Sequence, residues 1–390
     1  MNRIALLAAA TMAMTLPAAA LDQARFERIA AEIFAPIMAE HGVPGLALGV
    51  VIDGESHIYT AGVADPKTGR PVTADTLFEL GSVSKIFTVA LAARAERDGL
   101  LDIDERVAEY LPDLDGTPFG DLTLAALATH ATGGMPLHPP EGVTSRARML
   151  AWLARWTPAS PPAGTRSYSN LSIGVLGVIV ADRLGTSYAK AMDGDLFPAL
   201  GLDGTFVRIP EARQGDYAMG TNRDGRPTRM NVGFLVEEAY GVRSSVTDMT
   251  RFLAVALGEA DIDPGLAAAL ARTRTVYADT AHYAQAMIWE GYAWPVDPAA
   301  LARGNALDMA LKPQPQTPRV PPSELGADTY WNKTGSTSGF GTYLALLPSE
   351  RVGERVGVVL LANRAFPNPV RAAATVRLIE RMREAEDDGE

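Results

Sequence analysis

Strand-like segments stand at both ends of this chain, and a long, helix-rich stretch lies between them. Residues 45–51 and 55–61 are joined at Asp53-Gly54, a strong hairpin turn signal, and strand patterns return only near the C-terminus. Because a strand buries its apolar face within a sheet, the two ends are predicted to form one antiparallel sheet, into which the middle of the chain is inserted. The C-terminal strands are predicted at residues 329–334, 341–347 and 357–362.

Helices are predicted beside the sheet at both ends of the chain. Residues 22–40 place apolar side chains at helical spacing, and a last helix covers about residues 369–384. The Pro-rich residues 312–322 are predicted to form an extended connector. The predicted fold class is α+β, an antiparallel sheet flanked by helices with a helical region inserted, and the active site lies in the cleft between the two regions. The predicted sheet region comprises residues 21–80 and 325–390, and the mainly helical region, which includes a large binding loop, comprises residues 81–324.

The first twenty residues have the pattern of a secretory signal peptide. Arg3 precedes the mostly apolar residues 4–16, and Ala18-Ala19-Ala20 offers a small-residue cleavage site. The apolar run is short for a permanent membrane span, and no Cys follows it that a lipid could modify. We expect cleavage after Ala20, export to the periplasm and no membrane association of the processed chain, with an uncleaved N-terminal anchor as the alternative.

Composition narrows the chemistry. The sequence contains no cysteine, so neither a disulfide nor a thiolate nucleophile is available. Its five histidines show no metal-ligand spacing, and we predict no metal and no other cofactor. A formal net charge of −11 argues against nucleic acid or anionic lipid as a partner. Acyl-transfer chemistry in this chain would therefore use a hydroxyl nucleophile.

Ser82 and Lys85 are the candidate nucleophile and its adjacent amine. They lie where the strand-like residues 76–80 turn through Gly81 into a helix, so that positions i and i+3 share one helix face. The helix N-terminus favours negative charge at the hydroxyl, and an amine of lowered pKa can accept its proton. The same Ser-x-x-Lys spacing recurs at residues 187–190 without a preceding strand, so the spacing alone is weak evidence.

Two further motifs carry polar groups in separated parts of the chain. Tyr168 and Asn170 lie between a Pro- and Gly-rich loop and a long apolar helix, although a tyrosine there could instead be a core residue with a bonded hydroxyl. Lys333 begins Lys-Thr-Gly before a strand, and Gly335 would let a substrate approach the backbone closely. A second Lys-Thr-Gly at residues 67–69 follows Asp-Pro and is explained by turn chemistry.

In this order the three motifs resemble those of class C serine β-lactamases. The related set of Ser-x-x-Lys, Ser-Asp-Asn and Lys-Thr-Gly belongs to class A enzymes and penicillin-binding proteins. Here Tyr168 stands where that set has Ser, and the Glu and Asn expected of a class A deacylating base are missing. The resemblance covers about residues 24–382. Matching segments are residues 77–85, 127–130, 132–136, 198–202, 240–245, 248–249, 289–290, 294–295, 361–363 and 367–371.

The resemblance implies the serine β-lactamase/transpeptidase fold and an acyl-enzyme on Ser82. The tetrahedral oxyanion is expected between the backbone N–H groups of Ser82 and Ser336. Lys85 and Tyr168 would share the proton transfers. An isolated tyrosine has a pKa of about 10, and Lys85 and Lys333 would favour the phenolate, but they would equally favour a neutral Lys85 beside a protonated Tyr168. The residues leave both protonation states open.

The resemblance also implies how a substrate is held. His138 stands where the family usually has Gln, and Ala365 where Asn is common, so the substrate range is open. Residues 323–328 and 349–355 are longer than usual. The residues expected to bind substrate are Asn170 and His138 beside the acylamino side chain, Tyr240 as an aromatic wall, and Thr334, Gly335, Asn368 and Arg371 near the carboxylate, together with Lys333.

These features predict a periplasmic, monomeric class C β-lactamase that prefers cephalosporins. A small-molecule β-lactam is the expected partner, with no nucleic acid and no membrane. A D-alanyl-D-alanine carboxypeptidase or a carboxylesterase of the same fold is the alternative, because such enzymes acylate the same serine and differ mainly in deacylation. A peptidoglycan-binding module without turnover is the alternative from outside enzymes.

Overall fold

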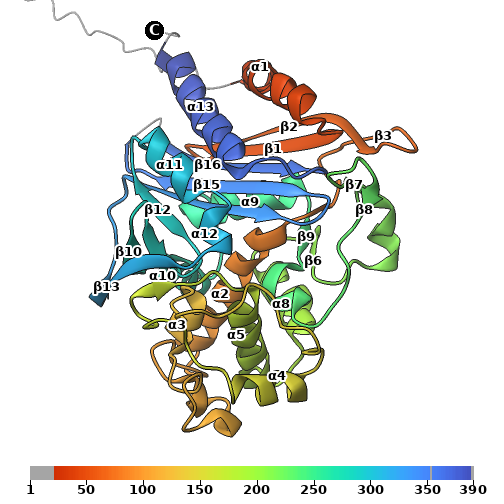
Figure 1. Cartoon of the computed structure of the whole chain (residues 1–390). Coiled ribbons are helices and arrows are strands. Elements are labelled where there is room, and N and C mark those ends of the chain that lie inside the picture. The colour runs from red at the N-terminus through yellow and green to blue at the C-terminus, as the bar shows by residue number, and fades with distance from the viewer. Residues whose placement is uncertain (1–21, 352–353, 388–390) are drawn as a thin grey trace, which may run out of the picture.

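The two ends of the chain meet in one sheet. The computed structural model describes residues 22–351 and 354–387, and Figure 1 shows its N- and C-terminal strands side by side. The first strand pairs antiparallel with the last, from Leu46 opposite Ala362 to Ile52 opposite Val356, which confirms the predicted sheet. Across the sheet the strands are β3 (Arg70–Pro71), β2 (Glu55–Asp65), β1 (Gly45–Ile52), β16 (Arg355–Ala362), β15 (Gly341–Pro348), β14 (Thr329–Ser336), β12 (Glu290–Ala293), β11 (Ala284–Ala286), β10 (Val276–Thr280), β13 (Gln314–Ser323) and β5 (Thr165–Arg166).

More of the middle of the chain joins this sheet than the sequence predicted. Strands β5, β10, β11, β12 and β13 all lie within residues 81–324, which were assigned to the mainly helical region. Of these, β5, β10, β11 and β12 have at most five residues and are too short to show a clear period of two. The expected connector at residues 312–322 forms most of β13, which pairs with β10 despite its prolines because it lies near the edge of the sheet.

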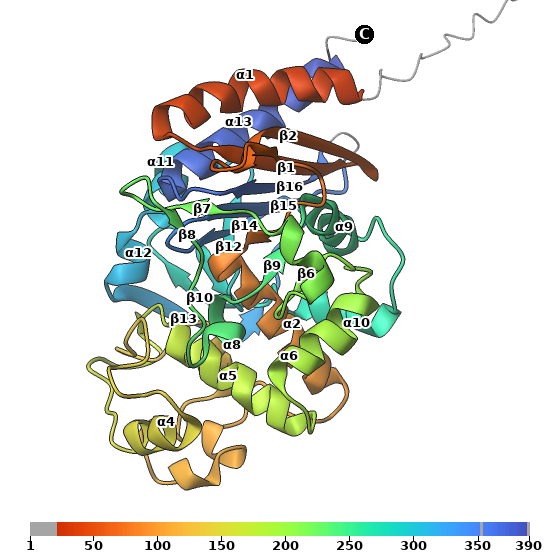
Figure 2. The same ribbon diagram turned by 90° about the vertical axis from the view of Figure 1, so that its right-hand side faces the viewer.

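Helices pack on both faces of the sheet. Helices α1 (Gln23–His41) and α13 (Asn368–Asp387) cover one face together with α11 (Pro298–Gly304), as Figures 1 and 2 show. Asp22 caps α1 by accepting from the Arg25 N–H at 2.6 Å, and α1 buries Phe26 and Ile33 against the sheet. Helix α9 (Val246–Leu257) packs against β1 and β16 on the other face. Every residue of β1 is buried, as expected for a strand covered on both sides.

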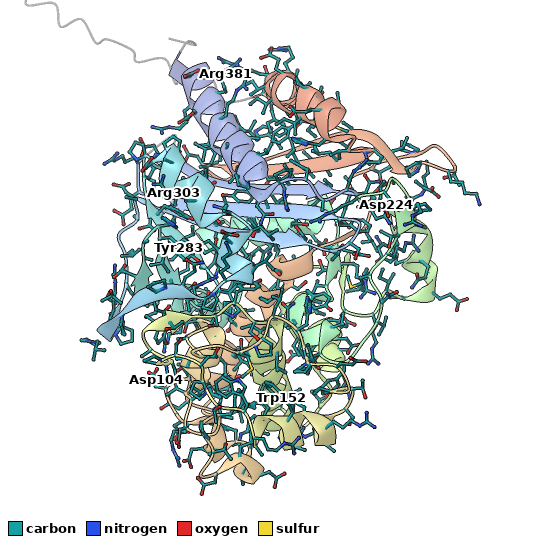
Figure 3. All side chains as sticks on the ribbon, in the orientation of Figure 1. Asp104, Trp152, Asp224, Tyr283, Arg303 and Arg381 are labelled. Atoms are coloured by element: carbon teal, nitrogen blue, oxygen red, sulfur yellow. The ribbon has the colours of Figure 1, made fainter. Side chains whose placement is uncertain are left out.

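A helical region continues from this second face. Helix α2 (Ser84–Arg97) is its centre, contacting α5 (Asn170–Arg183), α8 (Val236–Tyr240) and α10 (Pro264–Arg272), and most of its residues are buried. Side chains fill the space between the layers (Figure 3). The remaining helices and small strands are α3 (Leu124–Ala128), α4 (Arg146–Leu153), α6 (Tyr188–Ala191), α7 (Phe197–Ala199), α12 (Asp308–Leu311), β4 (Phe78–Glu79), β6 (Thr205–Phe206), β7 (Gly220–Thr221), β8 (Pro227–Thr228), β9 (Arg243–Ser244), and the single-turn elements η1 (Gly81–Val83), η2 (Val107–Glu109), η3 (Pro112–Leu114), η4 (Met192–Leu196) and η5 (Glu211–Asp216).

The expected signal peptide, residues 1–20, lies outside the described residues. In residues 22–351 and 354–387, no single helix has the length and apolarity needed to cross a membrane. One bent pair of helices, α5 with residues 188–199, meets that test by length and composition alone.

Candidate active site

The nucleophile candidate lies on a tight turn that touches the edge of β14. Gly81 has a φ of +54°, and a Cβ there would lie 2.6 Å from the backbone nitrogen of Ser336. A Cβ on Gly335 would lie 2.0 Å from the carbonyl oxygen of Leu80. Only glycine at both positions allows this contact between two backbones. The turn therefore brings Ser82 beside Ser336, as an oxyanion site built from their two backbone N–H groups requires.

Lys85 lies one helical turn beyond Ser82, as the spacing predicted. Its side chain is fully buried, and Nζ donates to Ser82 Oγ at 3.1 Å and to the carbonyl oxygen of Ala239 at 2.7 Å. Burial lowers the pKa of the Lys85 ammonium to about 8, with Tyr168 opposing the shift and Lys333 adding to it. The amine can therefore lose its proton near neutral pH and accept one from the serine hydroxyl.

Tyr168 contacts both lysines of the site. The Nζ atoms of Lys85 and Lys333 lie 5.2 Å and 5.3 Å from the centroid of its ring. Burial raises the pKa of the phenol, but the two ammonium groups outweigh it and lower the pKa to about 8. Phenol and amine therefore titrate in the same range, and the proton belongs to the Lys85–Tyr168 pair.

Lys333 reaches the site from β14 and is held by an ion cluster that the sequence did not predict. Its Nζ lies 3.6 Å from Glu290 Oε1 on β12, and Arg166 Nη2 lies 3.9 Å from the same oxygen. All three side chains are buried, and burying a charge is favourable only with such partners. A lone Glu290 within the apolar residues 287–293 is the sequence signal that could have found the cluster.

Three residues that were predicted to bind substrate, Asn170, His138 and Tyr240, lie close together near Lys85. Asn170 begins α5, and its Nδ2 lies 3.3 Å from Nδ1 of His138. The Tyr240 ring, at the end of α8, meets the His138 ring edge-on at 6.2 Å and lies 6.0 Å from Lys85 Nζ. Asn170 Oδ1 is buried without a partner among the described residues, so it is available to accept a hydrogen bond from a substrate amide.

Comparison with known proteins shows the family to which this chain belongs. The profile of the beta-lactamase family matches residues 30–381. A beta-lactamase of Yersinia enterocolitica is 37% identical over 372 residues, 95% of this chain and 95% of the relative. The chain belongs to the beta-lactamase family. The crystal structure of a class C beta-lactamase from Rhodobacter sphaeroides is 47% identical and has a TM-score of 0.87, covering 91% of this chain and 99% of that one. The crystal structure of a D-alanine carboxypeptidase from Burkholderia cenocepacia is 39% identical with a TM-score of 0.87, covering 92% and 100%.

The predicted family resemblance and fold class are thereby confirmed for this β-lactamase. The second copies of Ser-x-x-Lys and Lys-Thr-Gly, at residues 187–190 and 67–69, have structural roles. Ser187 caps α6 by accepting from the backbone N–H of Lys190 at 3.3 Å, and residues 67–69 form the turn between β2 and β3. The part of the chain that the structure describes contains no group of three or more His, Asp or Glu side chains able to hold a metal ion.

Arg371 lies at the site but faces protein acceptors. Its side chain is 1% exposed, and Nη1 donates to the carbonyl oxygens of Gly335 at 2.5 Å and Thr342 at 2.7 Å. Nη2 donates to Ser336 Oγ at 2.8 Å and bonds Asn368. Burial lowers the pKa of the guanidinium to about 9. In this β-lactamase Arg371 therefore supports the end of β14, where Thr334 is also half-buried, and direct contact with a substrate carboxylate stays a prediction.

Proposed function

We propose that this β-lactamase is a secreted class C enzyme that hydrolyses the lactam amide through an acyl-enzyme on Ser82. The observation that carries the proposal is the distance of 3.1 Å between the Ser82 hydroxyl and the buried Lys85 amine. Ser82 lies on a turn whose backbone contacts β14 closely because Gly81 and Gly335 have no side chains. Tyr168 beside both lysines supplies a second group for the proton.

In acylation these groups can accept and return every proton that the reaction moves. Ser82 Oγ bonds to the lactam carbonyl carbon while its proton passes to the Lys85–Tyr168 pair. The oxyanion is held by the N–H groups of Ser82 and Ser336, the C–N bond of the lactam breaks, and the leaving nitrogen takes the proton from the pair. In deacylation a water gives a proton to the pair as it attacks the ester carbonyl carbon. The pair then passes a proton to Ser82 Oγ as the ester C–O bond breaks, and the carboxylic acid product leaves.

The experiment that tests this assignment is Ser82→Ala, assayed with a chromogenic cephalosporin. We expect loss of turnover and, with a slowly released substrate, loss of the covalent mass increase seen by mass spectrometry. Tyr168→Phe should reduce acylation and deacylation by roughly 10²- to 10⁴-fold, because a positioned acid–base group contributes that much. Retained turnover in Ser82→Ala would contradict the nucleophile, and unchanged rates in Tyr168→Phe would contradict the proton step.

A D-alanyl-D-alanine carboxypeptidase is the second candidate, because a structure named a D-alanine carboxypeptidase matches 92% of this chain. The two functions differ in the lifetime of the acyl-enzyme. We propose a preference for cephalosporins, so a cephalosporin should show the highest kcat/KM among a cephalosporin, a penicillin, a D-alanyl-D-alanine peptide and a simple ester. Fast peptide turnover with a long-lived lactam adduct would favour the carboxypeptidase.

Export is part of the proposal and rests on the sequence of residues 1–20. A monomeric state is proposed with it. Mass spectrometry of the enzyme from a periplasmic extract should show an N-terminus at Leu21. Light scattering should give the mass of one chain. An enzyme that keeps residues 1–20 and remains with the membrane fraction would contradict the proposed processing.

A further inference from the structure

One residue bonds the backbone on both sides of Tyr168. The carbonyl oxygen of His130 accepts from the N–H of Ser167 at 2.8 Å, and its Nδ1 accepts from the N–H of Ser169 at 3.2 Å. The His130 ring also lies against the Tyr168 ring, with centroids 4.3 Å apart and planes inclined by 46°. The backbone and the ring of Tyr168 are therefore both in contact with His130.

The backbone of His130 has the left-handed conformation, which is uncommon for a residue other than glycine. Helix α3 ends at Ala128, and His130 follows with a φ of +60°, where helices most often have glycine. Histidine adopts this region more readily than branched residues, but still at a cost in conformational energy. A glycine would form the turn without strain but would lack a side-chain acceptor for Ser169. The acceptor is therefore the property that distinguishes histidine from glycine at this position.

The imidazole is held in the neutral state that this bond needs. Burial lowers the pKa of His130 well below its usual value, and Arg166, Lys85 and Lys333 lower it further. Nδ1 therefore stays an acceptor and the proton resides on Nε2. Nε2 is buried without a hydrogen-bond partner among the described residues, so the bonds that fix the ring are those on its Nδ1 side.

We propose that His130 is a positioning residue that keeps the Tyr168 phenol in place beside Ser82, Lys85 and Lys333. The inference rests on the proposed function, because it needs Tyr168 to take part in proton transfer. Displacing a reacting group by about 1 Å can cost a factor of the order of 10² in rate. His130 would thus affect the chemical steps without touching the substrate.

Two variants separate the acceptor from the ring. His130→Asn keeps an acceptor at the δ position and tolerates a positive φ, whereas His130→Phe keeps a ring and removes the acceptor. We expect His130→Phe to lower kcat on a chromogenic cephalosporin roughly 10- to 100-fold with a smaller change in KM, and His130→Asn to retain most of the activity. Should Phe prevent folding, His130→Gln, which moves the acceptor one carbon outward, carries the same expectation of loss.

The pH profile gives a readout that a purely structural role would not change. The pKa of Tyr168 is lowered by its two ammonium neighbours, so a phenol that moves away from them titrates at higher pH. The acid limb of kcat/KM should therefore shift upward in His130→Phe and stay in place in His130→Asn. The matched control is His57→Phe, because His57 is a buried imidazole on β2 beside Phe26, and this variant should leave the kinetics unchanged.

Failure of this inference is distinguishable from failure of the proposed function. If Tyr168→Phe is impaired while His130→Phe and His57→Phe both keep wild-type kinetics and differ from wild type only in Tm, the positioning role is overturned and the mechanism stands. If Tyr168→Phe itself is fully active, the proton step fails. In a Tyr168→Phe background, His130→Phe should change kcat by less than about 3-fold, because groups that act as a unit are not additive.

Discussion

At the scale of single residues, the fold places two groups with different ordinary pKa values in the same titration range. Burial brings the pKa of the Lys85 amine down to about 8, and the two ammonium neighbours bring that of the Tyr168 phenol to about 8. Proton transfer between groups of matched pKa needs little driving force in either direction, which suits a pair that must accept and return a proton in each half of the reaction.

The pH dependence of kcat/KM should report this pair. Below the shared range both groups are protonated and neither accepts the Ser82 proton, so kcat/KM is expected to fall as pH decreases through about 8. Lys333→Met removes the charge that lowers both pKa values, and the limb should move upward by about one pH unit. A limb that stays in place in Lys333→Met would show that Lys333 serves binding alone.

Residues that act through buried neighbours were the hardest to predict. His130 and Glu290 lie in two segments that resemble the family, but neither they nor Arg166 showed in the sequence which distant side chain or backbone group they contact. By contrast, Ser82 and Lys85 are close in sequence, and one helical turn suffices to bring them together.

At the scale of elements, the contact between the Ser82 turn and β14 is the feature that brings together the two backbones of the proposed oxyanion site. Two glycines remove the side chains that would separate the backbones, and Arg371 bonds the carbonyl oxygens of Gly335 and Thr342 from behind. The strand is thus fixed on one side by the turn and on the other by α13. The sequence predicted the strand and the helix, but the register that joins them became visible only in the fold.

Gly335→Ala should separate the two backbones, because its Cβ would lie 2.0 Å from Leu80 O. Loss of one oxyanion donor costs of the order of 10²- to 10³-fold in kcat. We expect a loss of that size, measured per active site by burst titration. Gly326→Ala is the control, since a Cβ there meets no atom within 4 Å. Equal activity of the two variants would argue against a close contact.

Arg371→Ala distinguishes support of β14 from direct recognition of substrate. Removing the guanidinium leaves buried carbonyl oxygens unpaired, at a cost of about 1–3 kcal/mol for each group, so Tm should fall by several degrees. A residue that only bound the substrate carboxylate would raise KM and leave Tm unchanged. Thermal unfolding followed by circular dichroism, together with steady-state kinetics, separates the two roles.

At the scale of the whole molecule, the site depends on segments that are far apart along the chain. Lys85 comes from α2 and Ser82 from the turn before it, Tyr168 precedes the N-cap of α5, and Lys333 lies on β14. One apolar core contains side chains of both the sheet and the helical region, among them Phe87. The two regions therefore share their stabilising contacts.

We expect loss of activity and loss of secondary structure to coincide on heating. The apolar cluster that contains Phe87 also includes Leu344 and Val359 of the sheet, so unfolding of the sheet would expose part of the core of the helical region. Residual activity and far-UV circular dichroism should give the same midpoint at one scan rate. A first transition that abolishes activity while most of the ellipticity remains would contradict this coupling.

The sequence by itself determined the class of fold, the nucleophile motif and the hydroxyl chemistry, because these depend on hydrophobic periodicity, local spacing and the lack of cysteine. It extended the mainly helical region to residue 324, although five strands of that stretch belong to the sheet. Only the tertiary structure decided that Arg371 faces the backbone, that Glu290 lies beside Lys333, and that His130 contacts the ring and flanking backbone of Tyr168. Those facts depend on burial and on pairing across the fold, which local sequence does not encode.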